Sequence, residues 1–168
     1  MKNVIRITAF VLFAVMAAAL MAGCNGSKDN APRNYEVTEL SKKIFENCSF
    51  EDEYLAEVED RAFALNLYNI DASLVAEKDG AKESSIYVSS AYPEMIVCIK
   101  AVDKAAASQV ESAMKAKIED YIKNYSNYNP AQISKLESAI VRTAGEYVVV
   151  AVTNDNAASA KYIDGIFK

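Results

Sequence analysis

The 168-residue sequence contains no histidine and only five glycines. Without histidine, the commonest general base and the commonest metal ligand are both missing, so Ser-His-Asp and Cys-His catalytic sets cannot form. The few, scattered glycines cannot build a phosphate-binding loop of the P-loop or dinucleotide type. The cysteines are too few and too distant for an ordinary zinc site. We therefore expect no catalytic set of these classes, no bound metal and no cofactor.

Clusters of basic residues are also missing. The chain has 18 Lys and Arg against 23 Asp and Glu, a formal charge of −5. An acidic protein repels the phosphate backbone, so nucleic acid is not expected as a partner. After Cys24 the longest apolar run is Tyr147 to Val152, which is too short to span a bilayer.

The amino-terminal segment has the pattern of a lipoprotein signal peptide. An uncharged apolar run from residue 7 to residue 20 follows two positive residues, and the small residues Ala22 and Gly23 stand directly before Cys24. This order is typical of a secretory signal. We expect cleavage after Gly23, lipid on Cys24, and attachment to the extracytoplasmic face of the cell membrane. The alternative is an uncleaved signal anchor in which Cys24 is an ordinary residue near the membrane surface.

Cleavage would divide the chain into three parts. Residues 1–23 would be the signal peptide, residues 24–34 a polar tether of loop-forming residues, and residues 35–168 one globular domain. Loss of Lys2 and Arg6 with the leader would bring the formal charge of the mature chain to −7.

Two cysteines, Cys48 and Cys98, remain in the domain. They could form one disulfide in an oxidising compartment, but their spacing shows no disulfide framework. Cys98 also lies inside an apolar, strand-like run. We favour two buried free thiols and keep the disulfide as the alternative.

Apolar periodicity predicts both helices and strands. Helices are expected over residues 35–47, from Ser49 to about Asp71, over residues 104–125, from Pro130 to about Leu136, and after Thr153, where Ala160, Ile163 and Phe167 would face inward. Strands are expected over residues 86–88, 95–102, 139–142 and 146–152.

The sequence also marks where these elements begin and turn. Asp79-Gly80 is a turn signal, and Asp103 and Asn129 are expected helix caps. The strand over residues 95–102 is nearly all apolar, so we expect it to be central and covered on both faces. We predict an α+β fold with a mostly antiparallel sheet of about four strands and helices packed on it.

Two groups of polar residues suggest chemistry only weakly. Ser112 and Lys115 form a Ser-x-x-Lys pair, as in penicillin-recognising serine enzymes, but no Ser-Asp-Asn or Lys-Thr-Gly follows, so we interpret them as solvated helix positions. The acidic residues after Ser49 lack the glycine of a calcium loop. We interpret them as a solvated helix start, with a weak cation site as the alternative; they are Glu51, Asp52, Glu53, Glu57, Glu59 and Asp60.

Tyr121, Tyr125 and Tyr128 lie close to one face of the predicted long helix. Exposed tyrosines can stack on sugar rings or contact a partner protein. The alternative is a half-buried stripe whose hydroxyls reach water. The three tyrosines are a possible partner contact.

Several segments occur together in an order that resembles a known family. They are the cysteine after small residues, the strand Pro93 to Ala101, a long helix, the restart Tyr128-Asn129-Pro130, and the strand Gly145 to Val150 followed by a polar cap and a short helix. This order resembles Gram-positive lipoproteins with a domain of unknown function, DUF family 4358, over most of residues 37–167. The resemblance implies attachment to the outer face of the cytoplasmic membrane and brings no known catalytic residues.

We therefore expect a membrane-tethered, non-enzymatic domain that binds an envelope protein or polysaccharide, or acts as an accessory to a membrane complex. The runner-up is an envelope hydrolase, because Asp and Glu are the remaining acid–base candidates in quantity. It predicts two acidic side chains that face each other in a cleft, at least one of them partly buried. A solute-binding lipoprotein is less favoured, because the domain is short for two lobes around a ligand.

Overall fold

The computed structural model describes residues 35–168, and the predicted signal peptide and tether, with Gly23 and Cys24, lie outside the described residues. The strands are β1 (Ala56–Glu57), β2 (Glu77–Lys78), β3 (Ala81–Lys82), β4 (Ser84–Val88), β5 (Met95–Lys100), β6 (Ile140–Ala144) and β7 (Tyr147–Val152). The α-helices are α2 (Val37–Asn47), α3 (Arg61–Leu67), α4 (Lys104–Tyr128), α5 (Ile133–Glu137) and α6 (Asn156–Ile166), and the short 3₁₀ helices are η1 (Ala72–Leu74) and η2 (Pro130–Gln132).

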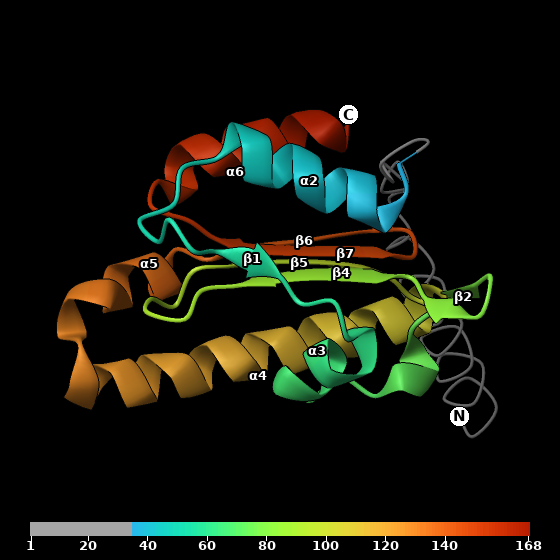
Figure 1. The fold of residues 1–168 in the computed structure, drawn as a ribbon, viewed down its shortest axis with the longest axis horizontal. Coiled ribbons are helices and arrows are strands. Elements are labelled where there is room, and N and C mark those ends of the chain that lie inside the picture. The colour runs from blue at the N-terminus through green and yellow to red at the C-terminus, as the bar shows by residue number, and fades with distance from the viewer. Residues whose placement is uncertain (1–34) are drawn as a thin grey trace, which may run out of the picture.

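An antiparallel sheet of five strands, in the order β1-β4-β5-β7-β6, forms the middle layer. Helices α2 and α6 cover one face, helices α3 and α4 cover the other, and α5 lies at one end of the sheet (Figure 1). The predicted α+β class and the antiparallel sheet are confirmed. The sheet has five strands rather than about four because the two-residue strand β1 pairs with β4 at its edge.

Strand β5 holds the two layers of the core together. Met95, Val97 and Ile99 point into the apolar cluster under α3 and α4, whereas Ile96 and Cys98 point into the cluster under α2 and α6. All five side chains are at most 1% exposed. A strand covered on both faces needs apolar residues at consecutive positions, which explains the unbroken run in the sequence.

The prediction of one helix from Ser49 to about Asp71 is wrong in its first half. Residues 49–60 form a loop and strand β1, and α3 begins only at Arg61. The cap of α3 is Asp60, whose Oδ1 accepts from the N–H of Phe63 at 3.0 Å. Helical propensity is a weak preference that tertiary contacts override, and residues 51 and 52 are held by contacts to the connection between β4 and β5.

Several local predictions are confirmed. Asp79 and Gly80 both have positive φ values, 53° and 77°, as a two-residue hairpin turn between β2 and β3 requires. Asp103 caps α4, and its Oδ1 accepts from the N–H of Ala106 at 2.7 Å. The helix restarts at Pro130 as predicted, but the side chain of Asn129 makes no capping hydrogen bond.

Cys48 and Cys98 are both free, as the sequence favoured. Cys98 is buried and Cys48 partly so. Burial raises the pKa of both thiols, so neither forms a reactive thiolate at neutral pH. Within residues 35–168, no helix has both the length and the apolar character needed to cross a membrane.

Candidate functional site

Four segments meet at the end of the sheet where α5 lies. They are the loop of residues 48–55, the connection between β4 and β5, helix α5, and the link between β7 and α6. Helix α2 begins at the opposite end of the molecule (Figure 1). A set of polar residues joins the first three segments; we name it the distal cluster, and it consists of Glu51, Asp52, Ser89, Glu94 and Lys135.

Glu94 is the buried centre of the distal cluster, with 0% of its side chain exposed. Its oxygens accept from the N–H of Glu51 at 3.0 and 2.9 Å and from the N–H of Asp52 at 3.0 Å. The ammonium of Lys135 donates to Oε1 at 2.9 Å. A buried carboxylate is tolerated only where such donors replace water. These contacts fix the backbone of residues 51 and 52 against the end of strand β5.

Lys135 lies between two carboxylates, because its ammonium contacts Glu51 as well as Glu94. The ring of Tyr92 lies 5.6 Å from the same ammonium. Burial lowers the pKa of Lys135, but the hydrogen bonds and charges of Glu51 and Glu94 outweigh burial and raise it. The hydrogen bond from Lys135 in turn lowers the pKa of Glu51. Lys135 therefore stays protonated and is an anchor rather than a nucleophile.

Asp52 ties the loop of residues 48–55 to the connection between β4 and β5. The hydroxyl of Ser89 donates to Oδ2, to which the N–H of Ser90 also donates at 3.2 Å. The N–H of Tyr54 donates to Oδ1 at 2.8 Å. The hydrogen bond from Ser89, followed by the bond from the Tyr54 backbone, lowers the pKa of Asp52.

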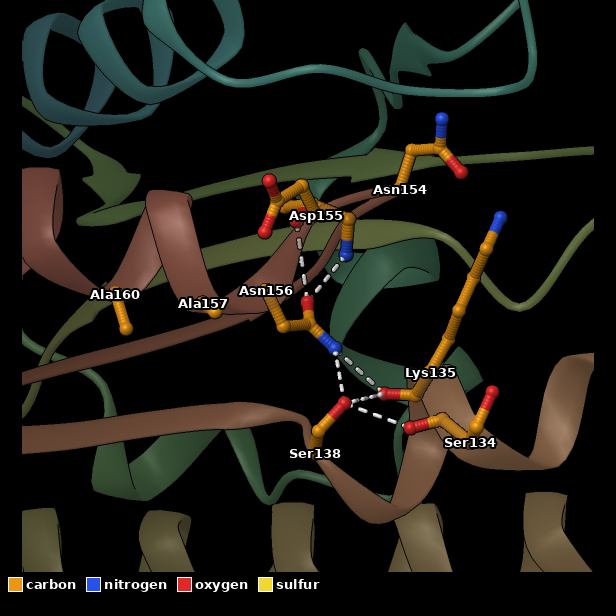
Figure 2. Close-up of a pocket in the computed structure, with 9 residues that line it drawn as sticks. Ser134, Lys135, Ser138, Asn154, Asp155, Asn156, Ala157 and Ala160 are labelled. Carbon is orange, nitrogen blue, oxygen red and sulfur yellow. Dashed lines mark hydrogen bonds between the residues drawn. The ribbon is translucent and has the colours of Figure 1, made fainter.

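An open pocket of about 450 Å³ lies beside the distal cluster, between α5 and the start of α6. Asn156 lines this pocket, and its side-chain amide makes four hydrogen bonds (Figure 2). Its Oδ1 accepts from the N–H and the hydroxyl of Thr153 at 2.8 and 3.1 Å. Its Nδ2 donates to the Lys135 carbonyl at 2.7 Å and to Ser138 Oγ at 3.0 Å. The amide of Asn156 is therefore fully used in joining β7 to α5. The pocket is lined by Ser134, Lys135, Ser138, Thr153, Asn154, Asp155, Asn156, Ala157 and Ala160.

The pocket presents small polar groups. The side chain of Lys135 extends away from Asn156 (Figure 2), toward its two carboxylates. Asp155 caps α6, since its Oδ1 accepts from the N–H of Ala158 at 2.9 Å. Across residues 35–168, no three His, Cys, Asp or Glu side chains gather in a way that could hold a metal ion.

The carboxylates of Glu51 and Glu94 converge on the ammonium of Lys135, so the structure does bring two acids together. Both oxygens of Glu94, however, already have donors, and the side chain is out of contact with solvent. A general acid or base needs a free lone pair or proton within reach of a substrate. The geometry therefore favours a role in anchoring three segments.

The predicted partner contact occupies the last turns of α4, at the same end of the molecule. Tyr121 and Tyr125 are half-buried against the cluster under α3 and α4, whereas Tyr128 is 77% exposed. Neighbouring rings meet edge to face, with centroids 6.5 and 5.7 Å apart. We name these three residues the tyrosine row. It begins in the core and ends on the surface.

The sequence missed Tyr54, which is 80% exposed on the loop of residues 48–55. It also missed Glu94, Lys135 and Asn156. A glutamate directly after a proline and directly before a buried strand was the available signal for Glu94, because a charge at that place needs a partner.

Other polar residues singled out in the sequence make local contacts. Ser112 donates to the carbonyl of Ser108 at 2.8 Å, and Lys115 pairs with Glu111 at 2.6 Å, so both are ordinary positions on α4. The solvated-helix interpretation is wrong for the acidic residues up to Glu59, which lie in the loop and β1, and Glu51 and Asp52 belong to the distal cluster. Asp60 does stand at a helix start, as the cap of α3.

Removing the charge of Glu94 should destabilise the fold strongly. We expect Glu94→Gln and Lys135→Met each to lower the free energy of unfolding by about 3–5 kcal/mol, because each breaks a buried ion pair. The first puts an amide in place of the acceptor of the Glu51 and Asp52 N–H groups, and the second leaves the buried charge of Glu94 without its cation. The double variant should lose less than the sum of the two, by about 1 kcal/mol or more. Urea denaturation measures all three.

A matched control for these variants is Lys123→Met, which breaks an exposed pair with Asp120 at 3.4 Å. We expect that change to cost less than about 1 kcal/mol. Additive losses for Glu94 and Lys135, or losses no larger than the control, would contradict an anchoring role for the distal cluster.

Asp52 should contribute to acid sensitivity. Its folded pKa lies below the ordinary value of 3.8, so its stabilising effect is complete above that value and is lost as the pH falls below it. We expect the free energy of unfolding to fall more steeply below about pH 4 in the wild type than in Asp52→Asn. Ser89→Ala should reduce this difference, and Glu59→Gln serves as an exposed control. Parallel pH curves for wild type and Asp52→Asn would show that Asp52 is not involved.

Comparison with known proteins places the chain in a family without assigning it an activity. The model of the family described as "Domain of unknown function (DUF4358)" matches residues 49–153. No curated protein and no solved structure matches the chain. The matched residues run from the loop that carries Glu51 and Asp52, through the whole of α4 and α5, to the end of β7. The chain therefore belongs to the DUF4358 family of domains of unknown function.

Proposed function

We propose that the mature protein is a lipoprotein anchored at the outer face of the cell membrane, and that its domain is a non-enzymatic binding or accessory module for an envelope protein or polysaccharide. Two observations support this proposal. One is the lipoprotein pattern that ends at Cys24. The other, which carries the binding role, is the position of the tyrosine row at the end of the molecule opposite the start of α2 (Figure 1).

The anchor follows from lipid at Cys24. Each buried CH₂ contributes about 0.8 kcal/mol, so one acyl chain binds a membrane marginally and two hold a protein there durably. Residues 24–34 would then join the bilayer to the start of α2. An extended stretch of this length spans about 40 Å at most. The domain would stay close to the membrane, with its far end available to partners.

The contact surface has the composition of known recognition surfaces. Tyrosine is enriched at interfaces because its ring offers a large apolar area while its hydroxyl still hydrogen-bonds. Tyr121 and Tyr125 pack against the core and hold the row in place. A partner that binds Tyr128 would therefore restrict little further side-chain motion, and the entropy lost on binding would be small. Tyr54, on the loop of residues 48–55, is a further exposed ring.

The states of the ionisable groups support a binding role. Glu94 and Lys135 are occupied by each other and by backbone donors. The free thiols have raised pKa values because they are buried. None of these groups is poised to transfer a proton or attack a substrate.

The first test concerns the anchor. We expect intact-mass measurement of protein from the membrane fraction to show a chain that starts at Cys24 and carries acyl groups. Cys24→Ser should abolish the lipid mass, and Cys48→Ser should keep it. An unmodified leader on the wild-type chain would refute the anchor.

The second test concerns the tyrosine row. A photoreactive residue placed at position 128 in intact cells should crosslink to an envelope component, while the same residue at the exposed position 161 on α6 should not. Tyr125→Ala should reduce the yield at position 128 by about tenfold, the effect of losing one well-packed contact. Equal yields at the two positions would exclude the row as the contact surface.

A further inference from the structure

Three aromatic rings form an exposed stack on the face of the sheet opposite the tyrosine row. The ring of Phe45, on the last turn of α2, lies 6.0 Å from that of Phe50 and 5.1 Å from that of Tyr87, with interplanar angles of 22° and 25°. Phe50 and Tyr87 pack against the apolar cluster under α2 and α6, and Phe45 is 38% exposed. We name these three residues the aromatic shelf.

The shelf is open because the sheet edge beside it is short. Strand β1 has only two residues, and it places Glu57 directly opposite Tyr87. The N–H of Val58 donates to the carbonyl of Ile86 at 2.9 Å. In an antiparallel pair, this pattern directs the N–H and C=O of Glu57 away from β4. The edge beside the shelf therefore offers one donor and one acceptor of the main chain.

Fixed negative charge borders the shelf. The hydroxyl of Ser85 donates to Glu57 Oε1 at 2.6 Å, and Ser85 Oγ itself lies 2.6 Å from Ser41 Oγ in the interior. This chain of contacts orients the Glu57 carboxylate, and the residue as a whole is exposed. Glu57 pairs across the strands with Tyr87, so both side chains lie on the same face of the sheet. Burial, followed by the charge of Glu57, raises the pKa of Tyr87.

Few cations of the protein itself neutralise this border. Lys42 lies 3.9 Å from Glu46, with both side chains more than half exposed, so the pair is weak. Within residues 35–168, Glu57 has no ion pair, and its carboxylate accepts from Ser85. A surface with exposed rings, a preoriented carboxylate and excess negative charge is complementary to a basic, apolar ligand.

We propose that the aromatic shelf and Glu57 form a docking surface for a protein segment that carries Lys or Arg side chains next to apolar ones. The apolar side chains lie on the rings of Phe45 and Tyr87, and burial of their surface supplies most of the affinity. A cationic side chain pairs with Glu57, and the segment's main chain bonds to the open groups of Glu57. The acidic charge of the whole protein raises the association rate.

This surface is independent of the proposed anchor and of the tyrosine row. The shelf rests on the cluster under α2 and α6, whereas the row rests on the cluster under α3 and α4, on the other side of the sheet. Failure of the lipid at Cys24 would leave the shelf unchanged. The two proposals therefore fail separately.

Binding of model peptides tests the proposal. The purified full chain is placed in neutral phosphatidylcholine nanodiscs and titrated into fluorescent peptides, and the fluorescence anisotropy of each peptide is recorded. One peptide alternates lysine with leucine, the second lysine with serine, and the third glutamate with leucine. We expect the lysine–leucine peptide to bind best, and Glu57→Gln and Phe45→Ser each to weaken it by about tenfold. Glu57→Gln should also make binding less sensitive to salt.

Two matched controls remove the same groups elsewhere. Glu119→Gln removes an exposed carboxylate of α4, and Phe63→Ser removes a ring of α3 that is 54% exposed. Neither should change the affinity by more than about twofold. Phe45→Leu keeps an apolar side chain and should fall between the wild type and Phe45→Ser, with circular dichroism confirming that each variant is folded.

Three results would overturn the proposal. The first is equal binding of the lysine–serine and lysine–leucine peptides, which would mean that charge alone is recognised. The second is a loss of affinity in the control variants as large as in Glu57→Gln and Phe45→Ser. The third is sedimentation of the wild type as a dimer that Phe45→Ser converts to a monomer, because the shelf would then be covered by a second copy of the chain.

Discussion

The contact on which the arrangement of this protein depends most is that between the buried carboxylate of Glu94 and its donors. Taking a charge out of water costs several kcal/mol, and only close, well-directed donors offset that cost. The N–H groups of Glu51 and Asp52 and the ammonium of Lys135 supply them. Because these donors come from separate segments, satisfying one charge joins a loop, a strand end and helix α5.

The far end of the molecule is built on that contact. The loop of residues 48–55 follows from the two N–H groups that Glu94 holds, and the same loop presents Tyr54 to solvent. Helix α5 is fixed through Lys135 on one side and through Asn156 on the other. The loop that carries Tyr54 and helix α5 are therefore held by contacts on more than one side. Such preorganisation reduces the entropy that a partner must overcome when it binds.

The sheet explains why two different surfaces exist on one small domain. Strand β5 sends alternate side chains into two separate apolar clusters, so each face of the sheet carries its own helices and its own aromatic residues. On one face the tyrosine row extends the core to the end of α4. On the other face, the short strand β1 leaves the aromatic shelf uncovered beside Glu57. Burial of apolar area decides both positions.

Patterns that act over a few residues were enough to predict much of this fold. Apolar periodicity and turn-forming residues predict four features that the structure contains: strand β5, helix α4 with its cap at Asp103, the turn at Asp79-Gly80, and the hairpin of β6 and β7. Lipid on Cys24 rests on the same kind of local pattern and remains a prediction. The sequence also placed Tyr121, Tyr125 and Tyr128 on one helix face, without showing which of them reaches solvent. Only the tertiary structure decided that residues 49–60 are not helical and that Glu94, Lys135 and Glu57 have defined partners. Those outcomes depend on contacts between segments 28 to 84 residues apart, and no local preference encodes which distant donor will reach a buried charge.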